Sequence, residues 1–254
     1  MNYPFVTNLS LFNKIDKNAA YPKINSNVII GIITGILVTL FIFSIVLLII
    51  IRKNIKNKNQ DKVGFLFEKK INGKMTMFAK ENGYKYFNGG LFKYGSNNFF
   101  EIDGLLATNK AIFVIETKNY VGNLTGDFAS LELILKNGKK DFKVKNPFLQ
   151  NLKHIRHIYN MCNFNFPIFS LLVLPENTKW IIENEENWSI VVNENNYEQK
   201  IKEVINETED IINNRTLAAL AEIVESSRTA SIKDIKKFGK IINNNSSKNK
   251  QNND

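Results

Sequence analysis

The longest uncharged stretch of the chain covers residues 27–51, is dominated by apolar side chains and contains no proline. A helix rises 1.5 Å per residue, so such a stretch is long enough to cross a hydrocarbon core about 30 Å thick. A cleaved signal peptide would have an apolar region of about 7–15 residues closer to the start of the chain. The pattern therefore predicts a transmembrane helix over residues 27–51, preceded by an N-terminal tail over residues 1–26.

The charges on either side of this stretch indicate its orientation. The C-terminal side carries a basic cluster opposed only by Asp61, and the cluster consists of Arg52, Lys53, Lys56, Lys58 and Lys62. Positive flanks stay on the cytoplasmic side of a membrane. We therefore expect a basic linker over residues 52–61 and a cytoplasmic domain after it. The N-terminal flank is also basic, so the reverse orientation stays open.

A helical pattern follows the linker. Apolar side chains recur at helical spacing, at Val63, Phe67, Ile71, Met75 and Phe78. Glu68 lies at the edge of this apolar stripe, and Gly83 is placed to end the helix. A short strand is expected over residues 84–87, before a turn at the two consecutive glycines that follow it.

Two apolar runs then form the centre of the predicted domain. Residues 99–108 and 111–117 read as strands, and the two residues between them are a hairpin-length connection. Four consecutive apolar residues in the second run indicate a strand that is buried on both faces. Counting back from the turn pairs Thr108 with Ala111.

The same register places Asp103 opposite Glu116, and Glu101 opposite Lys118. Like charges across a strand pair repel each other unless a cation lies between them. Mg²⁺ prefers a few carboxylate oxygens together with water, and would remove this conflict. Lys118 would then orient or deprotonate a water, or stabilise charge on a phosphate. The alternative is a solvated strand end without a ligand.

The following segments extend the same α/β pattern. A second hairpin, over residues 131–144 with an Asn-Gly turn, is expected to extend the sheet. Buried strands are expected over residues 169–174 and 189–192, and helices over residues 197–212, 217–224 and 231–242. This order predicts a mixed β-sheet flanked by helices on both faces.

A helix opened by Asn146 and Pro147 carries further candidate chemistry. Gln150, His154 and His157 are spaced so that they share one face of this helix. Two histidines and a glutamine are compatible with a zinc site. Contact with nucleic-acid phosphates is the other interpretation, because Lys153 and Arg156 lie on the same helix.

These segments together resemble a known family. The resemblance is carried, in order, by Gly64 and Glu68, by Ile102-Asp103, by Phe113-Val114-Ile115-Glu116-Thr117-Lys118-Asn119-Tyr120 with Gly122, and by Asn146-Pro147-Phe148-Leu149-Gln150-Asn151. The set is similar to the NERD, or nuclease-related, domain of the PD-(D/E)xK nuclease superfamily. We assign residues 62–194 to this domain.

The resemblance implies a restriction-endonuclease-like fold and a function for each matching residue. Asp103, Glu116 and Glu68 would hold Mg²⁺, for which Mn²⁺ can substitute. Lys118 would assist the attacking water, and Gln150 would complete the catalytic set. The sequence departs from the family at Gly104, where a histidine is usual, and at Phe67, where a glycine commonly precedes the glutamate.

Composition narrows the remaining function classes. The net charge of +10 suits a polyanionic partner, either nucleic acid or membrane. The single cysteine, Cys162, excludes an internal disulfide and a multi-cysteine zinc site. A helical region is expected over residues 195–242, followed by a disordered tail over residues 243–254. The composition leaves the oligomeric state open.

The expected function is that of a membrane-anchored, Mg²⁺-dependent nuclease of the cell membrane, acting on nucleic acid, with DNA as the expected substrate. The alternative is a catalytically inactive module that binds nucleic acid, or serves as a scaffold, at the membrane. Divalent-metal binding that is lost on Asp103→Ala distinguishes these alternatives, because a binding module has no need of the ion.

Overall fold

The computed structural model describes residues 26–96, 98–163, 165–209 and 211–251. The chain divides into two compact units, residues 1–58 and residues 59–254.

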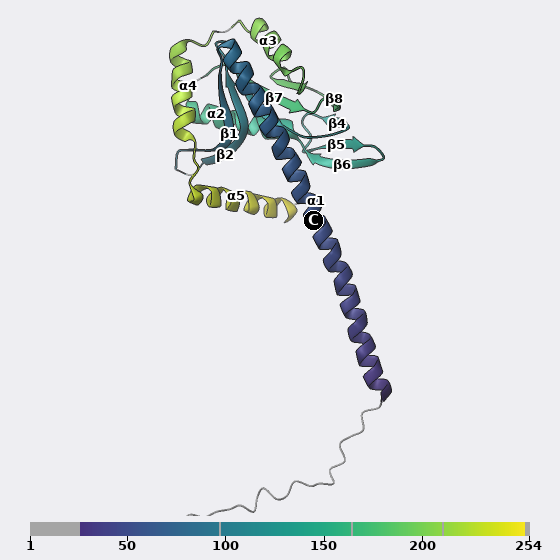
Figure 1. Ribbon diagram of the computed structural model, residues 1–254. Helices are drawn as coiled ribbons and strands as arrows, with labels where there is room; N and C mark the ends of the chain where they lie inside the picture. The colour runs from purple at the N-terminus through teal and green to yellow at the C-terminus, as the bar shows by residue number, and fades with distance from the viewer. Residues whose placement is uncertain (1–25, 97, 164, 210, 252–254) are drawn as a thin grey trace, which may run out of the picture. The chain divides into compact units, whose positions relative to one another are not determined.

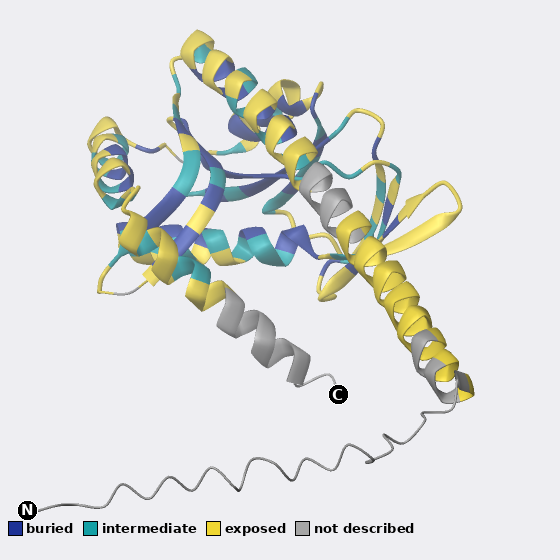
Figure 2. Ribbon diagram, turned by 60° about the horizontal axis from the view of Figure 1, so that its bottom comes forward, coloured by how far each residue is buried: buried dark blue, intermediate teal, exposed yellow. Residues whose placement is uncertain are grey.

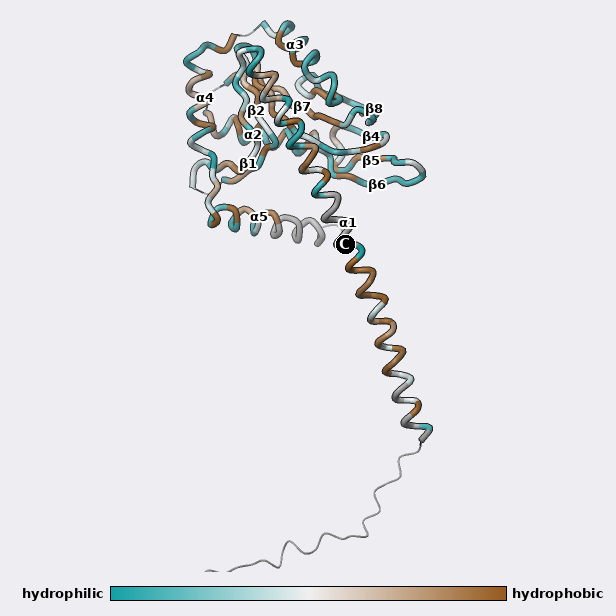
Figure 3. Tube along the Cα trace, viewed as in Figure 1, coloured by the Kyte–Doolittle hydropathy of each residue, from teal (hydrophilic) through white to brown (hydrophobic). Residues whose placement is uncertain are grey.

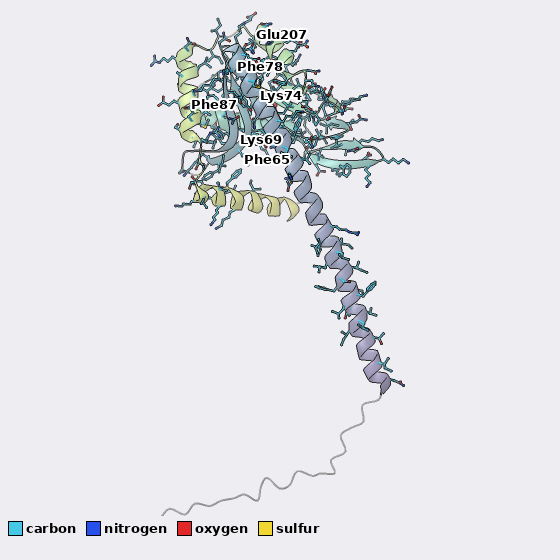
Figure 4. All side chains as sticks on the ribbon, viewed as in Figure 1. Phe65, Lys69, Lys74, Phe78, Phe87 and Glu207 are labelled. Carbon is cyan, nitrogen blue, oxygen red and sulfur yellow. The ribbon has the colours of Figure 1, made fainter. Side chains whose placement is uncertain are left out.

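The first unit contains the apolar part of helix α1, which runs over Ser26–Asn82. The segment Thr34–Arg52 has a mean hydropathy of 3.0, and none of it is buried. Figure 3 shows this segment as the most continuous hydrophobic stretch of the helix, and Figure 4 shows its side chains projecting on all sides. The predicted apolar helix is confirmed, and by length and composition it could cross a membrane, although a signal sequence would meet the same test.

The structure differs from the sequence prediction at the expected linker. Helix α1 includes residues 52–61, which were predicted to separate two helices. These residues are arginine, lysine, asparagine, isoleucine, glutamine and aspartate, without proline or glycine. None of these types interrupts a helix, which explains why the backbone stays helical.

The second unit is built around two β-sheets (Figure 1). One is five-stranded, in the order β1-β2-β3-β7-β9, and the other is four-stranded, in the order β6-β5-β4-β8. The strands are β1 (Lys85–Tyr94), β2 (Asn98–Ala107), β3 (Ile112–Thr117), β4 (Asn123–Asp127), β5 (Glu132–Asn137), β6 (Lys140–Lys145), β7 (Ile168–Leu174), β8 (Lys179–Glu183) and β9 (Ser189–Asn193). The helices that follow α1 are α2 (Pro147–Cys162), α3 (Tyr197–Glu207), α4 (Asn214–Ser227) and α5 (Ile232–Gln251).

Helices cover both faces of the five-stranded sheet, as the α/β pattern predicted. The part of α1 in this unit packs with α3 on one face, through a core that includes Ile71, Met75 and Phe78. Helices α2 and α4 pack on the other face, around Val114 and Ile158. Figure 2 shows the strands of this sheet buried between the helices, whereas the β5–β6 hairpin is largely exposed.

The central hairpin has the predicted register. Strands β2 and β3 are antiparallel, and Ala107 pairs with Ile112 and Gly104 with Ile115. Every residue of β3 is buried, as its uninterrupted apolar run indicated. Strand β3 then pairs in parallel with β7, which places its C-terminal end inside the sheet rather than at an edge.

Two predictions about strands are wrong. Strand β1 continues through Gly89 and Gly90, where a turn was predicted, and turns only after Tyr94. Glycine is required there because a Cβ on Gly89 would lie 2.4 Å from the carbonyl oxygen of Asp103. The β5–β6 hairpin does form, but it belongs to the second sheet, where β5 pairs with β4 instead of extending the first sheet.

The C-terminal helices are placed close to their predicted positions, with different ends. Helix α3 stops at Glu207, before the predicted end at Ile212. Helix α5 continues to Gln251, into the segment that was predicted to be a disordered tail. Asparagine, serine and lysine lower helix propensity only moderately, so they can extend a helix that apolar residues have already begun.

Gly89→Ala should destabilise the domain by roughly 1–3 kcal/mol, because the new methyl group meets backbone atoms that cannot move aside. Gly73→Ala is the matched control, since its added Cβ meets nothing within 4 Å and alanine favours a helix. Denaturant unfolding followed by tryptophan fluorescence measures the free energy of unfolding of both variants, because Trp180 and Trp188 lie in this unit. Equal stabilities for the two variants would show that Gly89 is not tightly packed.

Candidate active site

The site is centred on Glu116, which lies near the end of β3 with its side chain fully buried. Lys118 Nζ lies 2.5 Å from Glu116 Oε1. His154 Nε2, on α2, lies 3.5 Å from Glu116 Oε2. Apolar residues cover both faces of β3, so the Glu116 carboxylate near its end lies in the interior of the protein.

Glu116 Oε1 is paired with the Lys118 ammonium, whereas Oε2 has the His154 ring nearby and accepts no hydrogen bond within the part of the chain that the structure describes. A buried carboxylate is costly unless it is paired and hydrogen-bonded, or coordinates a metal. Glu116 therefore has unused coordinating capacity at a fixed position.

Asp103 lies on β2, next to Gly104, which is the last residue that pairs with β3 in the ladder. Beyond that point, the backbone N–H of Thr117 donates to Asp103 Oδ2 at 2.7 Å, and the Thr117 hydroxyl donates to the same oxygen at 2.8 Å. Burial, together with the charge of Glu116, raises the pKa of Asp103 to about 6, although the Thr117 hydrogen bonds act in the opposite direction.

Lys118 is partly buried, and two opposing effects act on its ammonium group. Burial lowers its pKa, but the adjacent Glu116 carboxylate and the nearby Asp103 outweigh this effect, so the pKa is raised above its usual value. Lys118 is therefore a cation at neutral pH, and donates hydrogen bonds instead of accepting a proton.

Glu68 comes to the same place from α1, on the opposite face of the sheet from α2. Burial raises its pKa to about 7, and the charges of Asp103, Glu101 and Glu116 act in the same direction. The mutual effects of these carboxylates show that Glu68 lies in the same electrostatic environment as the pair on the strands.

Helix α2 supplies the other side of the site. Asn146 caps it as predicted, accepting from the N–H of Phe148 at 2.8 Å, with Pro147 in the first turn. Gln150 Nε2 then lies 3.5 Å from His154 Nε2. Asn151 fixes the helix to the sheet by donating to the carbonyl of Val114 at 2.9 Å.

His154 and His157 do not converge on a common ligand. The ring of His157 stacks on Phe100 with the ring centroids 4.9 Å apart. Its Nδ1 lies 2.9 Å from the hydroxyl of Tyr94. The zinc interpretation therefore finds no support in how these two side chains lie.

The donor set is compatible with a Mg²⁺ ion. Within the described residues, no group of three or more His, Cys, Asp or Glu side chains is already assembled around a metal position. Mg²⁺ is usually held by one or two carboxylates, with water and substrate phosphates in its other positions. Asp103 and Glu116 match that need, and among the described residues Oε2 of Glu116 has no hydrogen bond to give up.

The structure brings the predicted residues together to different extents. Asp103, Glu116 and Lys118 meet where the β2–β3 ladder ends. Glu68 interacts electrostatically with these residues, and Gln150 is connected to Glu116 through His154. The contact of His154 with Glu116 was not predicted, although its spacing from Gln150 was a usable signal. Thr117 was also missed, because its hydrogen bonds to Asp103 form only where the strand ladder stops.

The raised pKa values of Asp103 and Glu68 predict a pH-dependent stability in the absence of metal. The folded state holds these protons more tightly than the unfolded chain, so their contribution is greatest at low pH and is lost as the pH rises through about 6 to 7. A divalent ion should offset this loss, raising the Tm by several degrees at pH 8 and much less at pH 5.

Thermal unfolding at the two pH values, in EDTA and in Mg²⁺, measures this effect. The variant Asp103→Asn should show a weaker pH dependence and a smaller response to Mg²⁺, while the exposed control Asp141→Asn should behave like the unmodified chain. A Mg²⁺ response that is the same at pH 5 and pH 8 would contradict the prediction.

Comparison with known proteins agrees with this geometry. Residues 63–175 match the family model described as the nuclease-related domain, NERD, and this match contains all five predicted site residues. No match to the chain was found among curated proteins or among solved structures. Residues 63–175 of the chain are therefore similar to the nuclease-related (NERD) domain family, and an apolar helical segment that could cross a membrane precedes them.

Proposed function

We propose that the protein is a Mg²⁺-dependent nuclease, anchored to the membrane, that hydrolyses phosphodiester bonds in DNA. The observation that carries this proposal is the meeting of Asp103, the fully buried Glu116 and the charged Lys118 where the β2–β3 ladder ends. The family match supports a nuclease-related function for the same segment.

Asp103 and Glu116 would hold the ion, with Glu68 as a third carboxylate. When bound, Mg²⁺ would supply Lewis-acid stabilisation of the charge that develops on the scissile phosphate. Thr117 prepares Asp103 for this role, because its two hydrogen bonds orient one carboxylate oxygen and favour the charged form of the group.

Lys118 would act as a cation. Because its pKa is raised, it keeps its proton at neutral pH and can donate to the attacking water or to a phosphate oxygen. Of the three roles predicted for Lys118, orientation of the water and charge stabilisation therefore fit the environment better than removal of a proton from water.

A polyanionic substrate fits the charge around the site. Lys153 and Arg156 are exposed on α2, the helix that also carries Gln150 and His154. Basic side chains on one helix can contact successive phosphates and position a nucleic acid without reading its sequence. DNA is the substrate that we propose, and RNA is its alternative in the assay below.

Cleavage of nucleic acid by the full-length chain in detergent micelles tests the proposal directly. We expect cleavage of plasmid or linear DNA with Mg²⁺ or Mn²⁺ and none with EDTA. Asp103→Asn and Lys118→Met should each lower the cleavage rate by about 100-fold or more, because each removes charge stabilisation in the transition state.

Matched surface variants serve as controls for these two substitutions. Asp141→Asn and Lys139→Ala change the same charges on the exposed β5–β6 hairpin, and should leave the rate unchanged. Binding of DNA without cleavage, under all metal conditions, would overturn the nuclease proposal. It would support the alternative of an inactive nucleic-acid-binding module.

We further propose that helix α1 spans the membrane with the nuclease-related domain in the cytoplasm, as the basic residues after Arg52 favour. Thiol labelling tests this topology, because the native Cys162 is buried and gives little background. A cysteine introduced at the exposed Ala129 should react only after the cells are permeabilised, whereas one at Ser10 should react in intact cells. Labelling of the Ala129→Cys variant in intact cells would establish the reverse orientation.

A further inference from the structure

The three carboxylates of the proposed metal site come from two different parts of the fold. Asp103 and Glu116 are on neighbouring strands, whose separation the β2–β3 ladder fixes. Glu68 is on α1, which packs on one face of the sheet and has no backbone ladder to the strands. The position of Glu68 relative to Asp103 therefore depends on side-chain contacts between α1 and the sheet.

One such contact is made by Tyr86, on β1. Its hydroxyl donates a hydrogen bond to the Oδ1 atom of Asn72. Asn72 follows Glu68 by four residues on α1, so the two side chains lie one helical turn apart on the same side of the helix. The hydrogen bond thus attaches α1 to β1 at a position one helical turn from the Glu68 carboxylate.

The same hydroxyl packs on the strand that carries Asp103. A Cβ added to Gly104, the residue after Asp103, would lie 2.0 Å from the Tyr86 oxygen and 2.8 Å from its Cζ. Residue 104 therefore has to be glycine for the tyrosine to lie where it does. The hydroxyl oxygen contacts the element that carries Glu68 and the element that carries Asp103.

The charged groups near the Tyr86 hydroxyl are consistent with its position between Glu68 and Asp103. Burial raises the pKa of Tyr86, and the carboxylates of Asp103 and Glu68 act in the same direction. Tyr86 consequently stays a neutral hydrogen-bond donor, and adds no charge to the carboxylate cluster.

We propose that Tyr86 is a positioning residue of the divalent-metal site, which holds Glu68 beside Asp103 through its hydrogen bond to Asn72. This inference rests on the proposed function, because it assigns Tyr86 a role in the same metal site. Without this hydrogen bond, Glu68 stays on its helix and the apolar contacts of α1 remain, but its distance to the other two carboxylates is less tightly fixed.

Mn²⁺ titration of the full-length chain in detergent, with free Mn²⁺ measured by electron paramagnetic resonance, tests the role of Tyr86 without relying on cleavage. Tyr86→Phe removes only the hydroxyl, and should raise the Kd for Mn²⁺ by about 3- to 10-fold, the range expected for one lost hydrogen bond. Asn72→Ala should raise the Kd similarly, and the double variant should add little to either single one.

The decisive comparison uses Glu68→Gln. If Tyr86 acts by holding Glu68, adding Tyr86→Phe to Glu68→Gln should leave the Kd unchanged. Tyr84→Phe is the matched control, because its ring packs in the same core, 6.0 Å from the ring of Phe78, and should not alter the Kd.

The other outcomes are distinguishable. A normal Kd for Tyr86→Phe, with or without a lower Tm, would overturn the positioning role and leave the proposed metal site intact. A full additional loss in the Glu68→Gln background would also overturn it, because Tyr86 would then act independently of Glu68. Failure of the unmodified chain to bind Mn²⁺ would overturn both this inference and the proposed metal dependence.

Discussion

The buried carboxylate of Glu116 is the constraint on which the rest of the site depends. A charge with no exposed surface is tolerated only if its neighbours compensate for the lost hydration. Lys118 provides a cation at 2.5 Å, and His154 approaches from the helix on the other side. Lys118 occupies one oxygen of Glu116, and the other accepts no hydrogen bond from the described residues, so the group is stabilised and still able to coordinate an ion.

The surrounding fold keeps a second carboxylate close to the first, despite the repulsion between them. The β2–β3 ladder ends at Gly104 and Ile115, and the hydrogen bonds from Thr117 then go to the side chain of Asp103 in place of a backbone carbonyl. On the far side of β2, the missing side chain of Gly89 lets β1 approach the backbone of Asp103 closely. Burial raises the pKa values of Asp103 and Glu68, and the repulsion between the crowded carboxylates acts in the same direction.

Local patterns were sufficient to predict the central hairpin and the capped helix α2. The turn after Thr108 sets the register of β2 and β3 by counting, and Asn146 with Pro147 marks the start of a helix. These features depend on residues close together in the sequence, which is why the Asp103, Glu116 and Lys118 cluster could be predicted. The apolar helix was likewise evident from its length and composition alone.

Features that depend on distant segments could not be predicted in this way. Strand β4 pairs with β8, and both are short strands without a strong alternating pattern, so the second sheet was missed. The path of β1 through its two glycines depends on the carbonyl groups of β2. The Tyr86 hydroxyl meets Asn72 only after α1 has packed on the sheet.

Asp103 and Glu116 are proposed to hold a divalent ion, and anomalous diffraction at the manganese edge, from crystals of the full-length chain grown with Mn²⁺ and a short DNA duplex, can detect that ion. We expect a single strong peak within about 2.2 Å of a carboxylate oxygen of each residue, with Lys118 turned from Glu116 toward the phosphate. An ordered site without a peak, in which Lys118 stays paired with Glu116, would show that these carboxylates hold no such ion.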